Sequence, residues 1–121
     1  MKLIELIAKV KEEKPTSFTN EKLTGFVNEV EADVQEQLGI EPEERKTYDY
    51  EADKETELLV GSPYSRLYVS YLKAQIDYAT EEYQSYENNQ AQHIADFREF
   101  VDMLVREGKV RVAPKRFKNI F

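Results

Sequence analysis

The residues of this chain that could perform chemistry are few and lie far apart in the sequence. His93 is the only histidine, and there is no cysteine. A histidine becomes a catalytic base or a metal ligand only where other reactive groups converge on it. Most metal geometries are excluded without a second histidine or a cysteine. We therefore interpret His93 as a histidine at the edge of the core, beside Phe100, rather than as a ligand or a catalytic base.

Acidic residues alternate along one loop in a way that resembles a calcium site. They are Asp49, Glu51, Asp53 and Glu55. A calcium-binding loop of the EF-hand type needs glycine at its sixth position and a bidentate acid at its twelfth. Lys54 and Val60 stand at those two positions. The sequence therefore favours a solvated acidic loop and predicts no metal site.

Glycine-rich phosphate-binding motifs are absent, because the four glycines stand singly at positions 25, 39, 61 and 108. A phosphate-binding loop needs several glycines close together. With no nucleophile, metal or cofactor motif, we expect a protein that is not an enzyme and needs no cofactor.

The stretch from Ser62 to Asn89 predicts the helix around which the chain is organised. Ser62 suits a helix cap and Pro63 suits a first turn. At 100° per residue, one arc of roughly 200° is mainly apolar and aromatic. It holds Tyr64, Leu67, Tyr68, Val69, Tyr71, Leu72, Ile76, Tyr78, Ala79, Tyr83 and Tyr86. The remaining side holds Arg66, Ser70, Lys73, Asp77, Thr80, Glu81 and Gln84. Because one neighbour cannot cover so wide an arc, we predict the central helix of a bundle.

Six of the eight tyrosines lie between Tyr64 and Tyr86. Tyrosine buries a large ring while its hydroxyl keeps a polar partner, and it is also favoured at protein interfaces. Both roles stay open, and the candidate interaction residues are Tyr64, Tyr68, Tyr83 and Tyr86. Glu82 projects into the same arc, where tyrosine hydroxyls are its nearest donors. We predict that Glu82 is buried, with a structural or interfacial role.

Three further helices are expected around the central one. Residues 2–13 carry an apolar stripe that Lys14-Pro15 ends. Thr19 caps a second helix, which Gly39 ends in a left-handed conformation. Asn88-Asn89 breaks the chain before a fourth helix that ends near Glu107 and runs antiparallel to the central helix. Residues 40–57 are expected to form a long loop, and the alternation within residues 46–50 hints at a short strand. The apolar residues 58–61 are expected to pack under the first turn of the central helix.

The charge is distributed unevenly between a helical domain, residues 1–108, and a basic arm, residues 109–121. The arm carries five cations and no acid. Subtracting these five charges from the net charge of −7 leaves −12 on residues 1–108. An acidic body argues against general binding to nucleic-acid phosphates. It favours basic protein partners.

The basic arm has two interpretations, a flexible terminus or a docking arm. In the second, it adds a strand to a neighbouring sheet edge or to residues 46–50, and its aromatic residues anchor in a pocket. The candidate contact residues are Val110, Val112, Lys115, Arg116, Phe117 and Phe121.

The N-terminal residues do not resemble a signal peptide, and no apolar run approaches the ~18 residues of a membrane span. The absence of cysteine is compatible with a reducing cytosol. We therefore expect a soluble protein that stays in the compartment where it is made.

Residues 58–89 and the second helix resemble small proteins encoded by phages and prophages of Gram-positive bacteria. The matching residues are Leu58, Leu59, Pro63, Leu67, Tyr68, Tyr71, Leu72, Ile76, Asp77, Glu82, Tyr83, Tyr86, Asn88 and Phe97, together with the segment FVNEVEADVQ. Two features depart from the pattern: Glu81 replaces a glycine, and DMLVREG replaces an aromatic-rich helix end.

This resemblance implies a mainly all-α bundle of about four helices that serves as a head–tail connector or neck protein. Its expected partners are portal, capsid or tail proteins, and it is expected to form a homo-oligomeric ring on a template. It would occupy the host cytoplasm during assembly and the virion afterwards, with no membrane contact and no sequence-specific nucleic-acid binding. The alternative is a small cytosolic adaptor or regulatory protein that binds one phage or host protein.

Overall fold

The computed structural model describes residues 1–108 and confirms the predicted all-α helical bundle. Within these residues there are five α-helices, one 3-10 helix and no strand. The helices are α1 (Leu3–Glu13), α2 (Asn20–Gln37), η1 (Pro42–Glu44), α3 (Tyr50–Asp53), α4 (Arg66–Ala79) and α5 (Tyr83–Arg106). The predicted arm, residues 109–121, lies outside the described residues.

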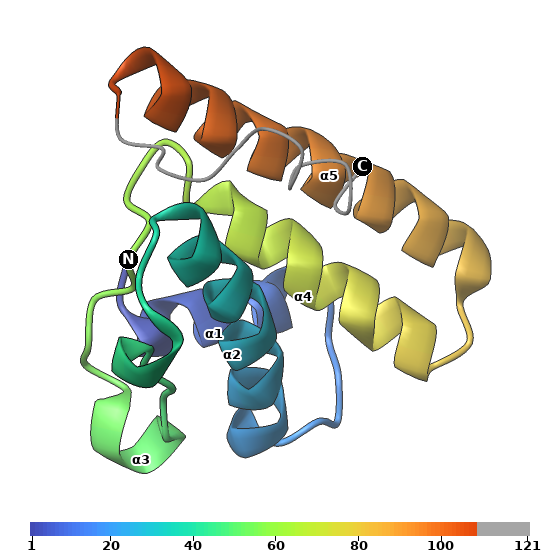
Figure 1. Ribbon diagram of the computed structural model, residues 1–121. Coiled ribbons are helices and arrows are strands. Elements are labelled where there is room, and N and C mark those ends of the chain that lie inside the picture. Colours follow the sequence, from blue (N-terminus) through green and yellow to red (C-terminus); the bar gives the residue numbers. More distant parts are fainter. Residues whose placement is uncertain (109–121) are drawn as a thin grey trace.

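Helix α4 lies in the middle of the bundle (Figure 1). Helix α5 runs antiparallel along one side of it, as predicted, and α1 and α2 pack against another side. The core is one continuous apolar cluster to which all four long helices contribute. On α4 the side chains of Leu67, Tyr68, Leu72 and Ile76 are almost completely buried. The central position of α4 confirms the expectation that its apolar arc contacts several neighbours.

The ends of α1 and α2 lie where the capping signals predict them. The Thr19 hydroxyl accepts a hydrogen bond from the Lys22 amide, which satisfies a free donor at the start of α2. Gly39 follows the end of α2 with a φ of 75°, the left-handed conformation that favours glycine. Helix α1 ends at Glu13, directly before Lys14-Pro15.

The segment before α4 holds the N-terminus against the domain. The Leu3 amide donates to the Thr56 carbonyl, and the Leu58 amide donates to the Met1 carbonyl. Leu58 and Val60 are buried, and the Val60 amide donates to the hydroxyl of Tyr68 on α4. Residues 58–60 therefore pack near the start of α4, as predicted.

The prediction of one helix from Ser62 to Asn89 is wrong at both ends. Helix α4 begins at Arg66, after a turn, and ends at Ala79. The chain then reverses at residues 80–82, where Glu81 has a φ of 61°. Helix α5 starts at Tyr83, so Asn88 and Asn89 lie inside this helix rather than at a break. The predicted central helix is in fact α4 plus the first two turns of its antiparallel partner.

Residues 46–49 form no regular element, so the predicted short strand is not present. Two side chains of α2 bind this backbone in place of a second strand. Asn28 accepts from the Tyr48 amide and donates to the Tyr48 carbonyl. Gln35 makes the same pair of hydrogen bonds with Lys46. These amide side chains lie seven residues apart, which places them on one face of a helix.

Candidate interaction surface

Five of the eight tyrosines fall into two groups, an inner group and an outer group. The inner group, Tyr48 and Tyr68, surrounds the carboxylate of Glu31, which is only 1% exposed. The Tyr68 hydroxyl donates to one Glu31 oxygen at 2.6 Å, and the Tyr48 hydroxyl donates to the other at 2.7 Å. The Leu59 amide donates to the second oxygen as well. This buried carboxylate is therefore satisfied by three donors from the protein itself.

The inner tyrosines act as hydrogen-bond donors, not as reactive groups. Burial and the neighbouring Glu31 charge raise the pKa of the Tyr68 hydroxyl far above its usual range. Burial and the hydrogen bond to Glu31 raise the pKa of Tyr48 in the same way. Both hydroxyls keep their protons at neutral pH. The Glu31 cluster therefore joins α2, the 46–49 segment, the 59–60 segment and α4.

His93 lies in the interface between α4 and α5. It is buried, and its Nδ1 lies 3.0 Å from the Leu67 carbonyl oxygen. Because a carbonyl can only accept, Nδ1 carries the proton and donates it. The ring also makes edge contacts with Tyr71 and Phe97. Burial lowers the pKa of the His93 imidazole, so the side chain is neutral at pH 7 and serves the packing of the two helices.

A second buried carboxylate, Asp77, closes the turn between α4 and α5. Its side chain is fully buried and forms a salt bridge with Lys14, which follows α1. Ser85 and Asn89, both in the first turns of α5, donate to its other oxygen at 2.7 Å. Burial opposes the charge, but the hydrogen bonds from Lys14, Ser85 and Asn89 lower the pKa of Asp77 below its usual value. One carboxylate thus fixes three segments around the turn.

Glu82 does not lie in a buried tyrosine cluster, so this prediction is wrong. Its side chain is 55% exposed, and it occupies the position before the first residue of α5. One carboxylate oxygen accepts a hydrogen bond from the Thr80 hydroxyl. The helix break at residues 80–82 moves Glu82 out of the arc in which a continuous helix would place it. The buried glutamate bonded to tyrosine hydroxyls is Glu31, on a different helix.

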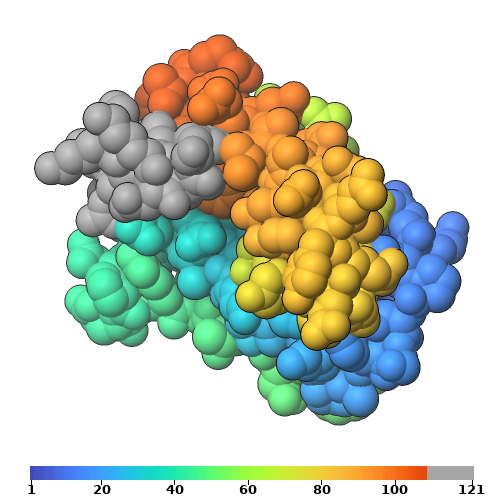
Figure 2. All heavy atoms as spheres, turned by 90° about the vertical axis from the view of Figure 1, so that its right-hand side faces the viewer, coloured from blue at the N-terminus to red at the C-terminus, as the bar shows by residue number. Residues whose placement is uncertain are grey.

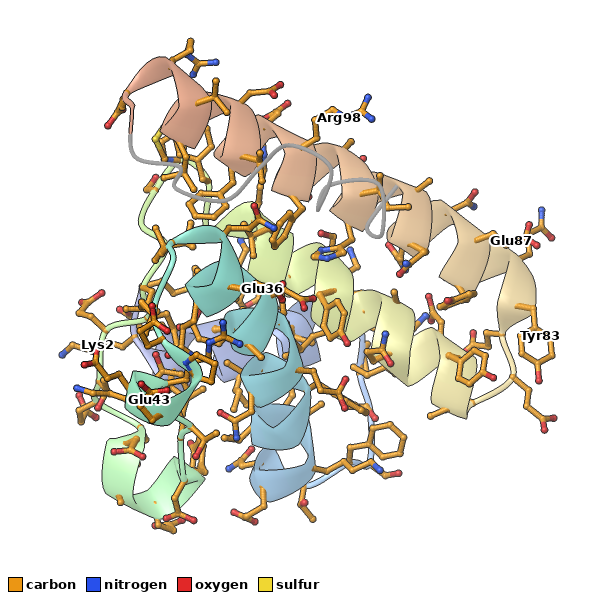
Figure 3. All side chains as sticks on the ribbon, viewed as in Figure 1. Lys2, Glu36, Glu43, Tyr83, Glu87 and Arg98 are labelled. Carbon is orange, nitrogen blue, oxygen red and sulfur yellow. The ribbon has the colours of Figure 1, made fainter. Side chains whose placement is uncertain are left out.

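The outer tyrosines gather around this turn. Tyr78 and Tyr83 are 59% and 54% exposed, among the most exposed large apolar residues of the described chain. The Tyr78 ring lies 6.2 Å from the Tyr83 ring and 5.3 Å from the Tyr86 ring, between ring centroids. Figure 3 shows the Tyr83 side chain pointing away from the body of the protein. In Figure 2 the turn (yellow) lies at the front of the molecule, with no described segment over it.

The remaining predicted site residues lie elsewhere. Tyr68 is completely buried and belongs to the inner group, while Tyr64 is half-buried beside the end of α5 and accepts a hydrogen bond from Arg106. The predicted set therefore does not form one surface: Tyr83 and Tyr86 come together, and Tyr64 and Tyr68 do not join them. Tyr78 is the residue that the candidate set missed. The predictions for Val110, Val112, Lys115, Arg116, Phe117 and Phe121 lie outside the described residues.

Comparison of the chain with known protein families, curated proteins and solved structures finds no match. Among the residues that the structure describes, no three acidic or histidine side chains are grouped to hold a metal ion. No helix in this part of the chain is long and apolar enough to cross a membrane. The functional argument therefore rests on the surface and on the sequence resemblance.

Proposed function

We propose that this chain is a non-enzymatic head–tail connector (head completion or neck) protein of a phage or prophage. In this proposal it docks between the capsid portal and the tail through the outer tyrosines Tyr78, Tyr83 and Tyr86. The observation that carries the proposal is a cluster of three aromatic rings, with Tyr78 and Tyr83 exposed and Tyr86 half-buried, on a turn held by the salt bridge between Asp77 and Lys14.

An exposed aromatic cluster of this kind suits protein binding. Tyrosine is enriched among the residues that carry most of the binding energy at interfaces. A side chain loses less conformational freedom on binding when its backbone is already fixed. The Asp77 hydrogen bonds fix the backbone on both sides of the turn. The outer tyrosines therefore present aromatic surface on a preorganised backbone.

The use of the buried polar side chains supports a role without catalysis. Glu31, Asp77 and His93 each bind groups of the protein itself. Asp96 likewise accepts from Ser70 at 2.9 Å across the α4–α5 interface. A catalytic site needs groups that converge on a space where a substrate fits. These four side chains instead connect helices.

The acidic body fits a subunit of a ring through which DNA passes. A surface with net charge −12 on residues 1–108 repels the phosphate backbone, so a duplex would slide through such a ring without binding. In this proposal the free protein is a monomer or weak oligomer in the host cytoplasm. It forms the ring on the portal as template and is then part of the virion.

Deletion of the gene from the phage or prophage that encodes the chain tests the proposal. We expect DNA-filled heads and separate tails in electron micrographs, because the joining protein is missing. Supplying the parent protein should restore complete particles, and supplying Tyr78→Ser/Tyr83→Ser should not. Val105→Ser is the matched control, because Val105 is an equally exposed apolar residue at the far end of α5. Complete, infectious particles without the gene would contradict the connector role and support the cytosolic adaptor.

A further inference from the structure

A groove lies at the opposite end of α4 and α5 from the outer tyrosines. Its volume is about 340 Å³, and it is open to solvent on one side. Leu38 after α2, Leu59 and Val60 before α4, and Phe100, Met103 and Leu104 on α5 supply most of its lining. Leu59 is 48% exposed, so the groove leaves a large apolar side chain in contact with water.

We propose that this groove binds the C-terminal residues 109–121 of the same chain, with Phe117, Ile120 and Phe121 as the anchoring side chains. The proposal is independent of the connector function, because it concerns the free monomer. In the docking-arm interpretation, the arm binds a neighbouring sheet edge or residues 46–50. In the present proposal, it binds the groove of its own chain.

The chemistry of the segment fits the groove. Its last five residues include three large apolar side chains, Phe117, Ile120 and Phe121. Burying one such side chain is worth roughly 1.5–3 kcal/mol. Phe100 and Leu104 on the α5 side of the groove are already buried, so its open apolar surface comes from the exposed Leu59 and from half-buried residues such as Met103. Docking would remove apolar groups of both partners from water.

The connection to α5 favours the chain's own segment over that of a second copy. Glu107 lines the groove, and Gly108 follows it with a φ of 68°, which turns the chain away from the axis of α5. The nine residues that follow Gly108, up to and including Phe117, span up to about 30 Å. A short tether of this kind gives an effective concentration in the millimolar range. A second copy at micromolar concentration cannot compete with it.

Charge complementarity also favours the binding of residues 109–121 to the groove. Residues 109–121 carry five cations and no acid. Glu107 lies at the groove, and Glu41, Glu43 and Glu44 are exposed within six residues of Leu38. Opposite charges on the two surfaces favour association at low salt and weaken it as salt rises. The arm is therefore held in the monomer until a partner displaces it.

Disulfide trapping in the full-length protein tests the proposal, because the parent contains no cysteine. The test variant is Met103→Cys/Asn119→Cys, which places one thiol in the groove and leaves the three anchoring side chains intact. The matched control is Asp102→Cys/Asn119→Cys, because Asp102 is the preceding residue, is exposed and does not line the groove. Both pairs have nearly the same loop length, so an undocked terminus would cross-link at similar rates in the two variants.

The expected result is a disulfide within one chain that forms at least about tenfold faster in the Met103 variant than in the Asp102 variant, as the docked state raises the local concentration. Non-reducing gels at micromolar protein and mass spectrometry measure the yield and separate disulfides within a chain from those between chains. Equal rates in the two variants would overturn the proposal in favour of a free terminus. Faster formation only between chains would assign the groove to a second copy.

A second measurement leaves the groove unaltered. In Phe117→Ser/Phe121→Ser, the backbone amides of residues 59–64 should exchange with deuterium about threefold or more faster than in the parent, because they lose a covering segment. The amides of residues 30–34, in the buried part of α2, serve as the internal control and should not change. Unchanged exchange at residues 59–64 would contradict the docking of the arm.

Discussion

Tyr68 of the inner group and Tyr78 of the outer group lie on the same helix, α4, but in different surroundings. Tyr68 is completely buried, and its hydroxyl both donates to Glu31 and accepts from the Val60 amide. Tyr78, ten residues later on α4, is 59% exposed and contacts the rings of Tyr83 and Tyr86. Helical periodicity alone places both residues on the same apolar arc.

The difference shows that the burial of a tyrosine depends on which other segment of the chain packs against it. Tyr68 lies where α2 and residues 58–60 cover α4, and Glu31 supplies an acceptor for its hydroxyl. Tyr78 lies at the end of α4, beside the turn into α5, and the described chain leaves it open. We therefore expect the inner group to contribute to stability, and we propose that the outer group serves binding.

The largest expected effect is the loss of the Tyr68 ring. Tyr68→Ala should lower the free energy of unfolding by about 3–5 kcal/mol, because it leaves a cavity and removes the Tyr68 donor from one buried Glu31 oxygen. Tyr83→Ala is the comparison from the outer group and should cost less than about 1 kcal/mol. Urea denaturation of both variants measures the difference. Equal losses at the two positions would abolish the division into two groups.

Loss of the Tyr68 hydroxyl alone should have the next largest effect. Tyr68→Phe keeps the ring but leaves a Glu31 oxygen and the Val60 amide without this partner, at a cost of about 1–3 kcal/mol. Tyr78→Phe removes an exposed hydroxyl and should be neutral within about 0.5 kcal/mol. Thermal unfolding would sharpen the comparison, and a neutral Tyr68→Phe would show that the Glu31 cluster contributes nothing to stability.

Asp77 should make the stability of the protein depend on pH. The folded-state pKa of Asp77 lies below its ordinary value of 3.8. Its contribution is therefore fully present above the unfolded-state pKa and is lost as the pH falls through the folded-state pKa. Asp77→Asn should destabilise the protein by about 1–3 kcal/mol at pH 7. In urea denaturation, the difference in unfolding free energy between variant and parent should shrink as the pH falls below about 4, and a difference that does not depend on pH would refute this role.

Glu82 should matter little for stability, because its side chain is largely exposed. Glu82→Gln and Glu82→Leu should both change the free energy of unfolding by less than about 0.5 kcal/mol. This expectation replaces the one that follows from a continuous helix, in which Glu82→Leu is the damaging variant. A loss above about 2 kcal/mol for Glu82→Leu would place Glu82 in a buried environment after all.

The sequence predicts the helices wherever capping residues or breakers mark their ends. Thr19, Gly39 and Gly108 act as the standard rules expect. The turn at residues 80–82 carries no such mark, because Glu81 adopts a positive φ that glycine usually adopts. That turn is stabilised by Asp77 through Lys14, Ser85 and Asn89, which are contacts between separate segments. Local sequence rules do not contain such contacts.

The buried polar side chains also cannot be predicted from the pattern of the sequence. Ser70 and Asp77 lie on the side of α4 that periodicity assigns to solvent, yet both are buried by α5. Glu31 lies on α2, and its partners come from three other segments. A buried carboxylate is recognisable only when its donors are known. Of the three outer tyrosines, the sequence analysis therefore predicted Tyr83 and Tyr86 as interaction residues and missed Tyr78.

The decisive functional test uses a variant whose stability should differ little from that of the parent. Tyr78→Ser/Tyr83→Ser should unfold within about 1 kcal/mol of the parent, because both rings are largely exposed. The measurement is the number of copies per purified particle when this variant replaces the parent protein, with Val105→Ser measured in parallel. The account predicts a folded protein that is lost from particles, while Val105→Ser enters at the parent level. Normal occupancy of the tyrosine variant would contradict the assignment of the outer tyrosines to docking.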